Sequence, residues 1–246
     1  DREGMRVTTA EFFAQGAPRL RLAGPAAVRW RPRLQLEGLH LAEGGSSFKA
    51  SAVGGESGRV EVSAREISSR WFEDFVPTAG PAWHLTLLAL LGSWDRGPMK
   101  FSLSAGASLE LGEGRTAAVM ASARGDRGGM EIDALRVTEG DSTVVNALGH
   151  LPVTFMPGGA PWMVIAPDGP LRIDATVVPH AAFWQKLAAV SGVELQEPVA
   201  AAHLTGTWQR PEGTAQLKAA RIVIDPKRVK QALPAIENLD VQLTGD

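Results

Sequence analysis

Alternation of apolar and polar residues is the feature that most constrains the fold of this chain. From Met99 to Leu111 the odd positions hold Met, Phe, Leu or Ala, and the even positions hold Lys, Ser, Gly or Glu. A period of two places successive side chains on opposite faces of a β-strand. The pattern recurs over 171–177 and over 34–41, where Gly38 shifts it by one residue, as a β-bulge does. The sequence therefore predicts strands with one apolar and one polar face.

Glycine-rich turns separate many such segments, which is typical of antiparallel hairpins. Further strands are predicted over 19–23, 48–53, 59–67, 82–94, 116–124, 130–138, 142–155, 202–208, 214–224 and 239–244. Only three short helices are predicted, over 68–75, 179–190 and 226–233. Three helices cannot cover a dozen apolar strand faces. Either the sheet closes on itself as a β-sandwich, or it forms an elongated, curved antiparallel β-groove whose apolar interior holds a ligand.

A weak internal repeat favours the elongated form. Ala82–Leu85 followed by Gly92–Pro98 is similar to Ala201–Leu204 followed by Gly206–Gly213, and the two glycines that open the turns are 206 − 92 = 114 residues apart. Stacked repeats build quasi-one-dimensional proteins. We expect a first β-module over 1–67, a helix and β-module over 68–178 and another over 179–246, all within one continuous groove. Because the chain begins without Met and ends inside an alternating pattern, we expect an internal segment of a longer protein.

Composition and motifs exclude several classes of function. A formal net charge of -2 argues against a nucleic-acid partner. The most apolar run, 85–91, is too short to span a bilayer, which takes about 20 residues. The chain has no Cys, and its five His lack metal-ligand spacing, so we predict no metal and no cofactor. A Gly-x-Gly match at Gly112 lies between two strands and not before a helix, so it does not predict a nucleotide site. We predict no catalytic residues, and hence a protein that is not an enzyme.

The apolar strand faces supply the candidate site. Burial of acyl chains contributes about 0.8 kcal/mol per CH₂, which is enough for such a face to hold a lipid. The residues predicted to line the groove are Phe101, Leu103, Leu109, Leu111, Ile132, Leu171, Ile173, Leu204, Leu217 and Ile224. Aromatic residues of the short helices are predicted to act as a rim or plug, namely Trp71, Phe72, Phe183 and Trp184.

Several short segments of the sequence resemble segments of the AsmA-like family, in particular of its TamB (translocation and assembly module) type. They are Pro170–Ala175, Ala181–Trp184, Leu204–Thr207, Arg210–Gly213, Leu39–Ala42 and Ile236–Asp246. The resemblance implies a periplasmic protein of a diderm bacterium, anchored in the inner membrane. It also implies a β-taco groove that conducts phospholipids between the inner and outer membranes. TamB-type members have an outer-membrane barrel of the Omp85 class as a partner, which a region outside this segment would meet.

Two alternatives remain open from the sequence. One is a scaffold for outer-membrane protein assembly, which would pair its open sheet edges with strands of a client. The other is a closed β-sandwich with a structural or carbohydrate-binding role, in which Trp94 and Trp208 would contact sugar.

Overall fold

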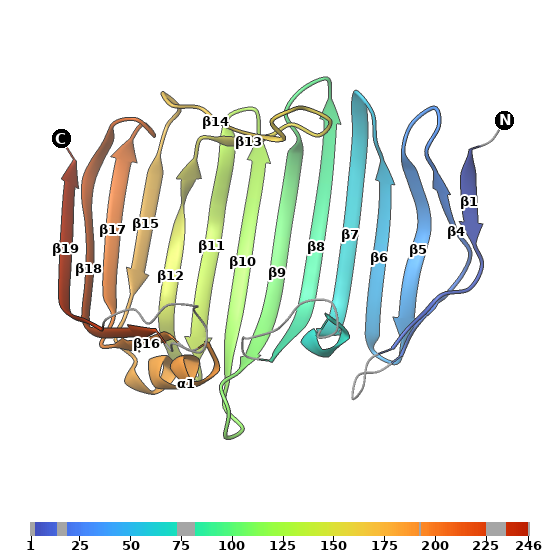
Figure 1. Ribbon diagram of the computed structural model, residues 1–246. Helices are drawn as coiled ribbons and strands as arrows, with labels where there is room; N and C mark the ends of the chain where they lie inside the picture. Colours follow the sequence, from blue (N-terminus) through green and yellow to red (C-terminus); the bar gives the residue numbers. More distant parts are fainter. Residues whose placement is uncertain (1–2, 14–18, 73–81, 192, 225–234, 246) are drawn as a thin grey trace.

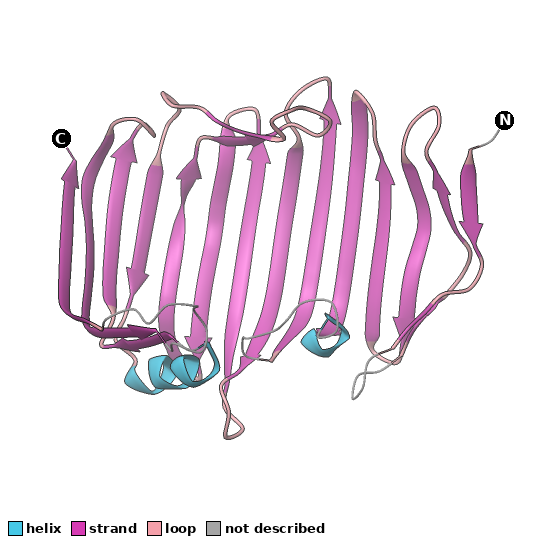
Figure 2. Ribbon diagram, viewed as in Figure 1, coloured by secondary structure: helices cyan, strands magenta, loops and turns pink. Residues whose placement is uncertain are grey.

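Over the residues that the structure describes, the fold is one very wide β-sheet with two short helices at its lower end (Figures 1 and 2). The computed structural model describes residues 3–13, 19–72, 82–191, 193–224 and 235–245, and it is 70% strand and 4% helix. The strands are β1 (Gly4–Val7), β2 (Glu11–Phe12), β3 (Leu20–Leu22), β4 (Ala26–Arg29), β5 (Gln35–Glu43), β6 (Ser46–Val53), β7 (Ser57–Ser68), β8 (Trp83–Asp95), β9 (Lys100–Glu110), β10 (Thr116–Asp126), β11 (Gly129–Glu139), β12 (Ser142–Leu151), β13 (Val153–Phe155), β14 (Met163–Ile165), β15 (Arg172–Val177), β16 (Val193–Gln196), β17 (Val199–Gly206), β18 (Pro211–Ile224) and β19 (Ile236–Gly245).

Seventeen of the described strands form a single antiparallel sheet. From the N-terminal edge its main course is β1, β4, β5 to β12, β15, β17, β18 and β19, while β3 joins β5, β2 joins β3, and β16 joins β18. Successive hairpins add strands almost in chain order, so the sheet grows in one direction. Within the described residues β1 and β19 pair on one side only. The sheet is therefore an open, elongated groove, as predicted, and the closed β-sandwich is wrong.

Local predictions held in most of the chain. The bulge expected at Gly38 is present, because the pairing of β5 with β6 shifts between Leu36 and Leu39, and Gly38 has a φ of 70°. The strand predicted over 142–155 divides into β12 and β13 at Pro152, which cannot donate a ladder hydrogen bond. Pairing runs unbroken from β7 to β8 and from β15 to β17, across both expected module boundaries.

Two of the three predicted helices appear. Residues 179–190 give α1 (Ala181–Ser191). The described part of 68–75 gives a 3₁₀ turn, η1 (Ser69–Phe72), and 73–75 lie outside the described residues. The third, over 226–233, lies outside the described residues. No helix in the described ranges has the length and apolar character needed to cross a bilayer.

The core gathers in two clusters at the lower end of the sheet, where both helices lie (Figure 1). One cluster places Trp71 of η1 on residues of β3, β5 and β7, namely Leu20, Leu41, Ala64 and Ile67. The other places Phe183 and Trp184 of α1 on Leu111, Ala117 and Val144. Each helix therefore covers the lower margin of the same sheet face.

A strap crosses the upper end of that face. The hairpin β13–β14 is joined to the sheet by the Met99 amide, which donates to the Phe155 carbonyl at 2.7 Å. The Phe155 ring meets the Phe101 ring edge to face at 5.5 Å between centroids. Phe101 itself lies over Gly125, where a Cβ atom would come within 2.2 Å of the ring. Between this strap and the helices, the middle of the face has no covering layer among the described elements.

Candidate functional site: an apolar face across the sheet

The candidate site is the sheet face that carries the odd-numbered residues of β9. Paired residues of neighbouring strands lie on the same face, so the register defines rows that cross the sheet. The central row crosses twelve strands and contains only Leu39, Ala50, Val62, Leu90, Leu103, Ala123, Ile132, Gly149, Ile173, Leu204, Gly213 and Gly245. At a strand spacing of about 4.8 Å its eleven steps extend over roughly 53 Å. No polar side chain interrupts it.

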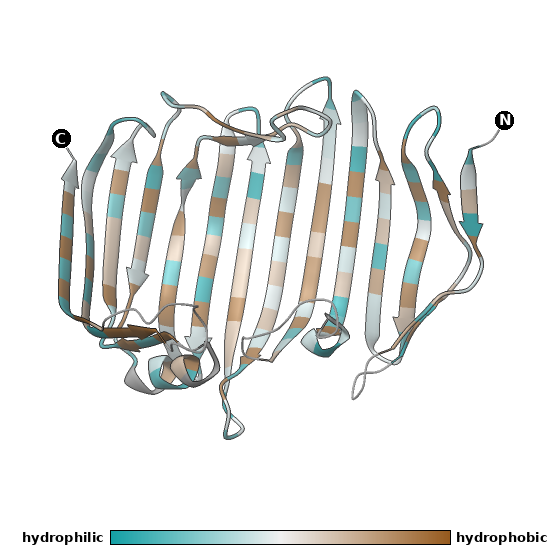
Figure 3. Ribbon diagram, in the orientation of Figure 1, coloured by the Kyte–Doolittle hydropathy of each residue, from teal (hydrophilic) through white to brown (hydrophobic). Residues whose placement is uncertain are grey.

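Two further rows toward the lower end repeat this composition. The next row consists of Leu41, Phe48, Ala64, Leu88, Ala105, Ala121, Leu135, Ala147, Ala175, Ala202, Ala215 and Leu243. The third consists of Ile67, Leu85, Ala107, Val119, Val137, Val145, Val177, Ala200, Leu217 and Val241. Figure 3 shows the resulting hydropathy banding along the strands. We call these three rows the apolar face.

The middle of the apolar face is half-buried, in contrast to its lower margin. Leu103, Ile132, Ile173 and Leu204 are all partly exposed, whereas residues beneath α1, such as Ala117, are fully buried. Large aliphatic side chains that stay half-buried along some 50 Å of a sheet form a surface that no other described element covers. The helices and the strap flank it, so the free surface is a trough that runs across the strands.

The structure brings most of the predicted lining residues together. Leu103, Ile132, Ile173 and Leu204 share the central row, and Leu217 lies in the third. Phe101 and Leu109 lie on the same face at the upper and lower ends of β9, beneath the strap and beside α1.

Three predicted residues lie elsewhere. Leu111 is buried beneath α1, and Leu171 is buried at the upper end, where its amide donates to the Gly206 carbonyl. Ile224 pairs with Val193 of β16, beyond the part of β18 that meets β17, so it is not in the rows. Of the predicted rim residues, Trp71, Phe183 and Trp184 are buried in the two clusters, and the Phe72 side chain lies outside the described residues.

Sequence reasoning missed much of the face. Leu88, Leu90 and Leu135 belong to the rows but follow no clean alternation. Val62 alternates cleanly with Glu61 and Ser63 but was not among the predicted lining residues. A bulge in each of β8 and β11 shifts the pattern, because the pairing jumps from Leu85 to Leu87 and from Ile132 to Leu135. The pairing register was the missing information.

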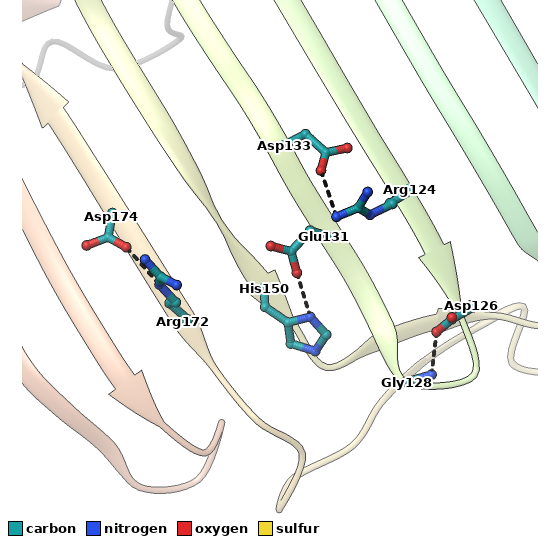
Figure 4. Close-up of polar contacts among 8 residues, drawn as sticks. All are labelled: Arg124, Asp126, Gly128, Glu131, Asp133, His150, Arg172 and Asp174. Carbon is teal, nitrogen blue, oxygen red and sulfur yellow. Dashed lines mark hydrogen bonds and ion pairs between the residues drawn. The ribbon is translucent and has the colours of Figure 1, made fainter.

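The opposite face, which we call the polar face, carries ion pairs between neighbouring strands (Figure 4). Arg124 of β10 meets Asp133 of β11 at 3.2 Å, and Glu131 of β11 meets His150 of β12 at 3.0 Å. Such exposed pairs contribute little stability, about 0–1 kcal/mol each. The described residues contain no group of three or more His or acidic side chains that could hold a metal ion.

The two histidines of the internal repeat each bind a carboxylate of the neighbouring strand. His84 lies 2.6 Å from Glu66 of β7, and His203 lies 2.5 Å from Asp174 of β15. Asp174 also accepts a bond from Arg172 at 3.0 Å. Among the described residues no nucleophile hydrogen-bonds to either imidazole, so these pairs lack the contacts of a catalytic triad.

The hydrogen bond from His203, followed by that from Arg172, lowers the pKa of Asp174 below its ordinary value. The charged form is thus favoured by folding. Its stabilising contribution is present above the unfolded-state pKa and is lost as pH falls through the lower folded-state value. We expect His203→Ala to raise the Asp174 pKa in a ¹³C-detected NMR titration. Glu237, on β19, gives the control resonance, and an unchanged Asp174 pKa would contradict the assignment.

A buried carboxylate lies where α1 meets the sheet. Glu139, at the end of β11, is only 6% exposed and pairs with Arg115 and with His180, whose Nδ1 is 3.2 Å from it. Lys186 of α1 reaches Glu113 of the β9–β10 turn at 2.7 Å, and this contact lowers the pKa of Glu113. These ion pairs orient α1 over the lower margin of the apolar face.

Comparison with known proteins adds no identification. No family model matches the chain, and neither a curated protein nor a solved structure shows significant similarity to it. The apolar face is therefore the feature of this chain that points to a function.

Proposed function

We propose that the apolar face conducts phospholipids, holding their acyl chains in the trough while the head groups remain in water. The observation that supports this is the central row, which crosses twelve strands with no polar side chain. On this proposal the protein works without catalysis in the periplasm, between the inner and outer membranes, as the resemblance to TamB-type proteins implies.

Energetics are consistent with both holding and movement. Each acyl CH₂ that leaves water contributes about 0.8 kcal/mol, so even a partly covered chain is retained. Along each row, an acyl chain meets similar small and aliphatic side chains at every strand, and it has no specific hydrogen bond to break when it moves to the next strand. A lipid can therefore shift along the face at little cost.

Lipid analysis of the protein purified without detergent tests the proposal. We expect phospholipid to co-purify at near-stoichiometric amounts, measured by mass spectrometry of an organic extract against a protein standard. A protein of similar size purified in parallel corrects for carry-over. Lipid at the level of that control would refute the proposal.

A second candidate, the assembly scaffold, is favoured by the free edge of the sheet. β19 is ten residues long, pairs only with β18 among the described strands, and exposes Val241 and Leu243. Long apolar edges accept further strands. In this case Val241→Pro, which removes a backbone donor, would impair client assembly, and charges on the apolar face would not. An Omp85-class partner belongs to this proposal.

A further inference from the structure

The upper end of the sheet carries a second surface, distinct from the apolar face. We call it the upper rim and define it as residues 30–34, 54–55, 126–128, 155–169 and 208–210. These turns close the upper ends of the strands, along the top edge in Figure 1.

Contacts show that the upper rim is continuous. Gly54 and Gly55 lie against Leu34 and Arg33, and Gly55 in turn lies next to Gly158 of the β13–β14 hairpin. At the other end, the amides of Trp208 and Gln209 donate to the carbonyls of Gly169 and Pro167, at 3.3 and 2.9 Å. The segment 155–169 therefore links the β4–β5 turn to the β17–β18 turn.

Large apolar side chains project from the upper rim into water. Trp30 is 48% exposed, Trp162 is 65% exposed and Trp208 is 46% exposed. Leu34, Met163 and Val164 are also exposed. Tryptophans with an apolar body and one N–H donor are enriched where protein meets the head-group region of a bilayer.

Arginines accompany these tryptophans. Within the described residues, Arg33, Arg127 and Arg210 form no ion pair, whereas Arg31 pairs with Glu3. Of the acidic neighbours, Glu56 meets Arg96, whereas Asp126 and Asp95 accept hydrogen bonds from the Gly128 amide and the Ser57 hydroxyl. Asp95, Asp126 and Asp168 therefore keep their charge beside the arginines. Cations beside exposed tryptophans match the phosphates and the interfacial region of a lipid surface.

We propose that the upper rim docks on the surface of an anionic phospholipid bilayer. Trp30, Trp162 and Trp208 enter the head-group region, and Arg33, Arg127 and Arg210 contact phosphates. The edge-to-face Phe101–Phe155 pair and the stacked Phe155–Trp162 pair, at 5.5 and 5.7 Å, form an aromatic path from the apolar face to the rim. Docking here would bring a membrane to the trough that the proposed function assigns to lipids.

Vesicle co-sedimentation tests this docking. We expect the wild-type protein to sediment with vesicles of phosphatidylglycerol and phosphatidylethanolamine, and weakly with phosphatidylcholine vesicles. Each arginine near an anionic surface is worth about fivefold in binding, so Arg33, Arg127 and Arg210 changed together to Gln should lose about a hundredfold. Trp162→Ala with Trp208→Ala should weaken binding to both kinds of vesicle.

The matched control changes three cations of the polar face, Lys49, Arg65 and Arg136, to Gln. It removes the same charge and should retain binding. An equal loss of binding in the control would show that only net charge matters. If the wild-type protein did not sediment with vesicles, the exposed residues of the upper rim would instead indicate a protein partner. Either result would overturn the proposal. Leu103→Asp should still sediment, so a failure of the lipid-conducting function is distinguishable from a failure of docking.

Discussion

Leu103→Asp and Ile173→Asp should each strongly reduce lipid loading while the sheet stays folded. Both side chains lie in the central row, where Leu103 is flanked by Leu90 and Ala123, and Ile173 by Gly149 and Leu204. A carboxylate against acyl chains has no partner, and its desolvation costs several kcal/mol. Because 1.4 kcal/mol is tenfold in affinity, we expect at least about a tenfold drop in bound phospholipid.

The fold should tolerate these substitutions because both positions are half-buried. In the lipid-free protein the new carboxylate can reach water above the face, so the unfolding midpoint in urea should fall only modestly. The matched control is Ser104→Asp, next in the chain to Leu103 but on the polar face, between Ala89 and Ser122. Lipid retained by both row variants, or lost equally in the control, would contradict the lipid-conducting trough.

Alternation predicted the fold where strands are regular. β9 and β15 alternate without interruption, so the sequence alone assigns their apolar residues to one face. The bulge in β5 could also be predicted from the sequence, because the alternation shifts at Gly38 and glycine readily adopts the positive φ found there. Because short turns join most consecutive strands as antiparallel hairpins, the order of the strands in the sheet follows almost directly from their order in the chain.

Sequence reasoning failed where neighbouring strands decide which face a residue occupies. In β8 the run from Leu87 to Leu91 is apolar on both faces, with Leu88 and Leu90 in the rows and Leu87 and Leu91 exposed on the polar face. The extra residue of the bulge in β8 is between Leu85 and Leu87, and it lies opposite Gly106 of β9. The glycine in the sequence of β9 therefore does not mark the strand that carries the bulge. The bulge and the apolar run together conceal the alternation, and only the pairing register resolves it.

The upper rim was hidden for a different reason. Trp162 and Trp208 lie 46 residues apart in turns of no regular period, and long-range contacts join their segments through Gly169. In the sequence each tryptophan is consistent with a packing residue. Their exposure is what distinguishes them from Trp71 and Trp184, which are buried in the two clusters.

Phe183→Ala should be among the most destabilising single substitutions in the chain. Phe183 is 3% exposed, meets Trp184 edge to face at 4.8 Å, and packs in the cluster of Leu111, Ala117 and Val144. Truncation of a buried Phe costs about 3–5 kcal/mol through lost transfer energy and the remaining cavity. The loss should appear as a large fall in the urea midpoint with a similar slope.

The control for this prediction is Phe13→Ala, the same chemical change at a side chain that is 77% exposed. Surface substitutions stay within about 0.5 kcal/mol, so its midpoint should match the wild type. In a wide sheet with a half-buried middle, few sites enclose an aromatic side chain fully. The two core clusters are such sites, and α1 forms one of them. If Phe183→Ala and Phe13→Ala shifted the midpoint equally, α1 would not be a structural anchor of the lower margin, and the trough would have to be stabilised by its hairpins alone.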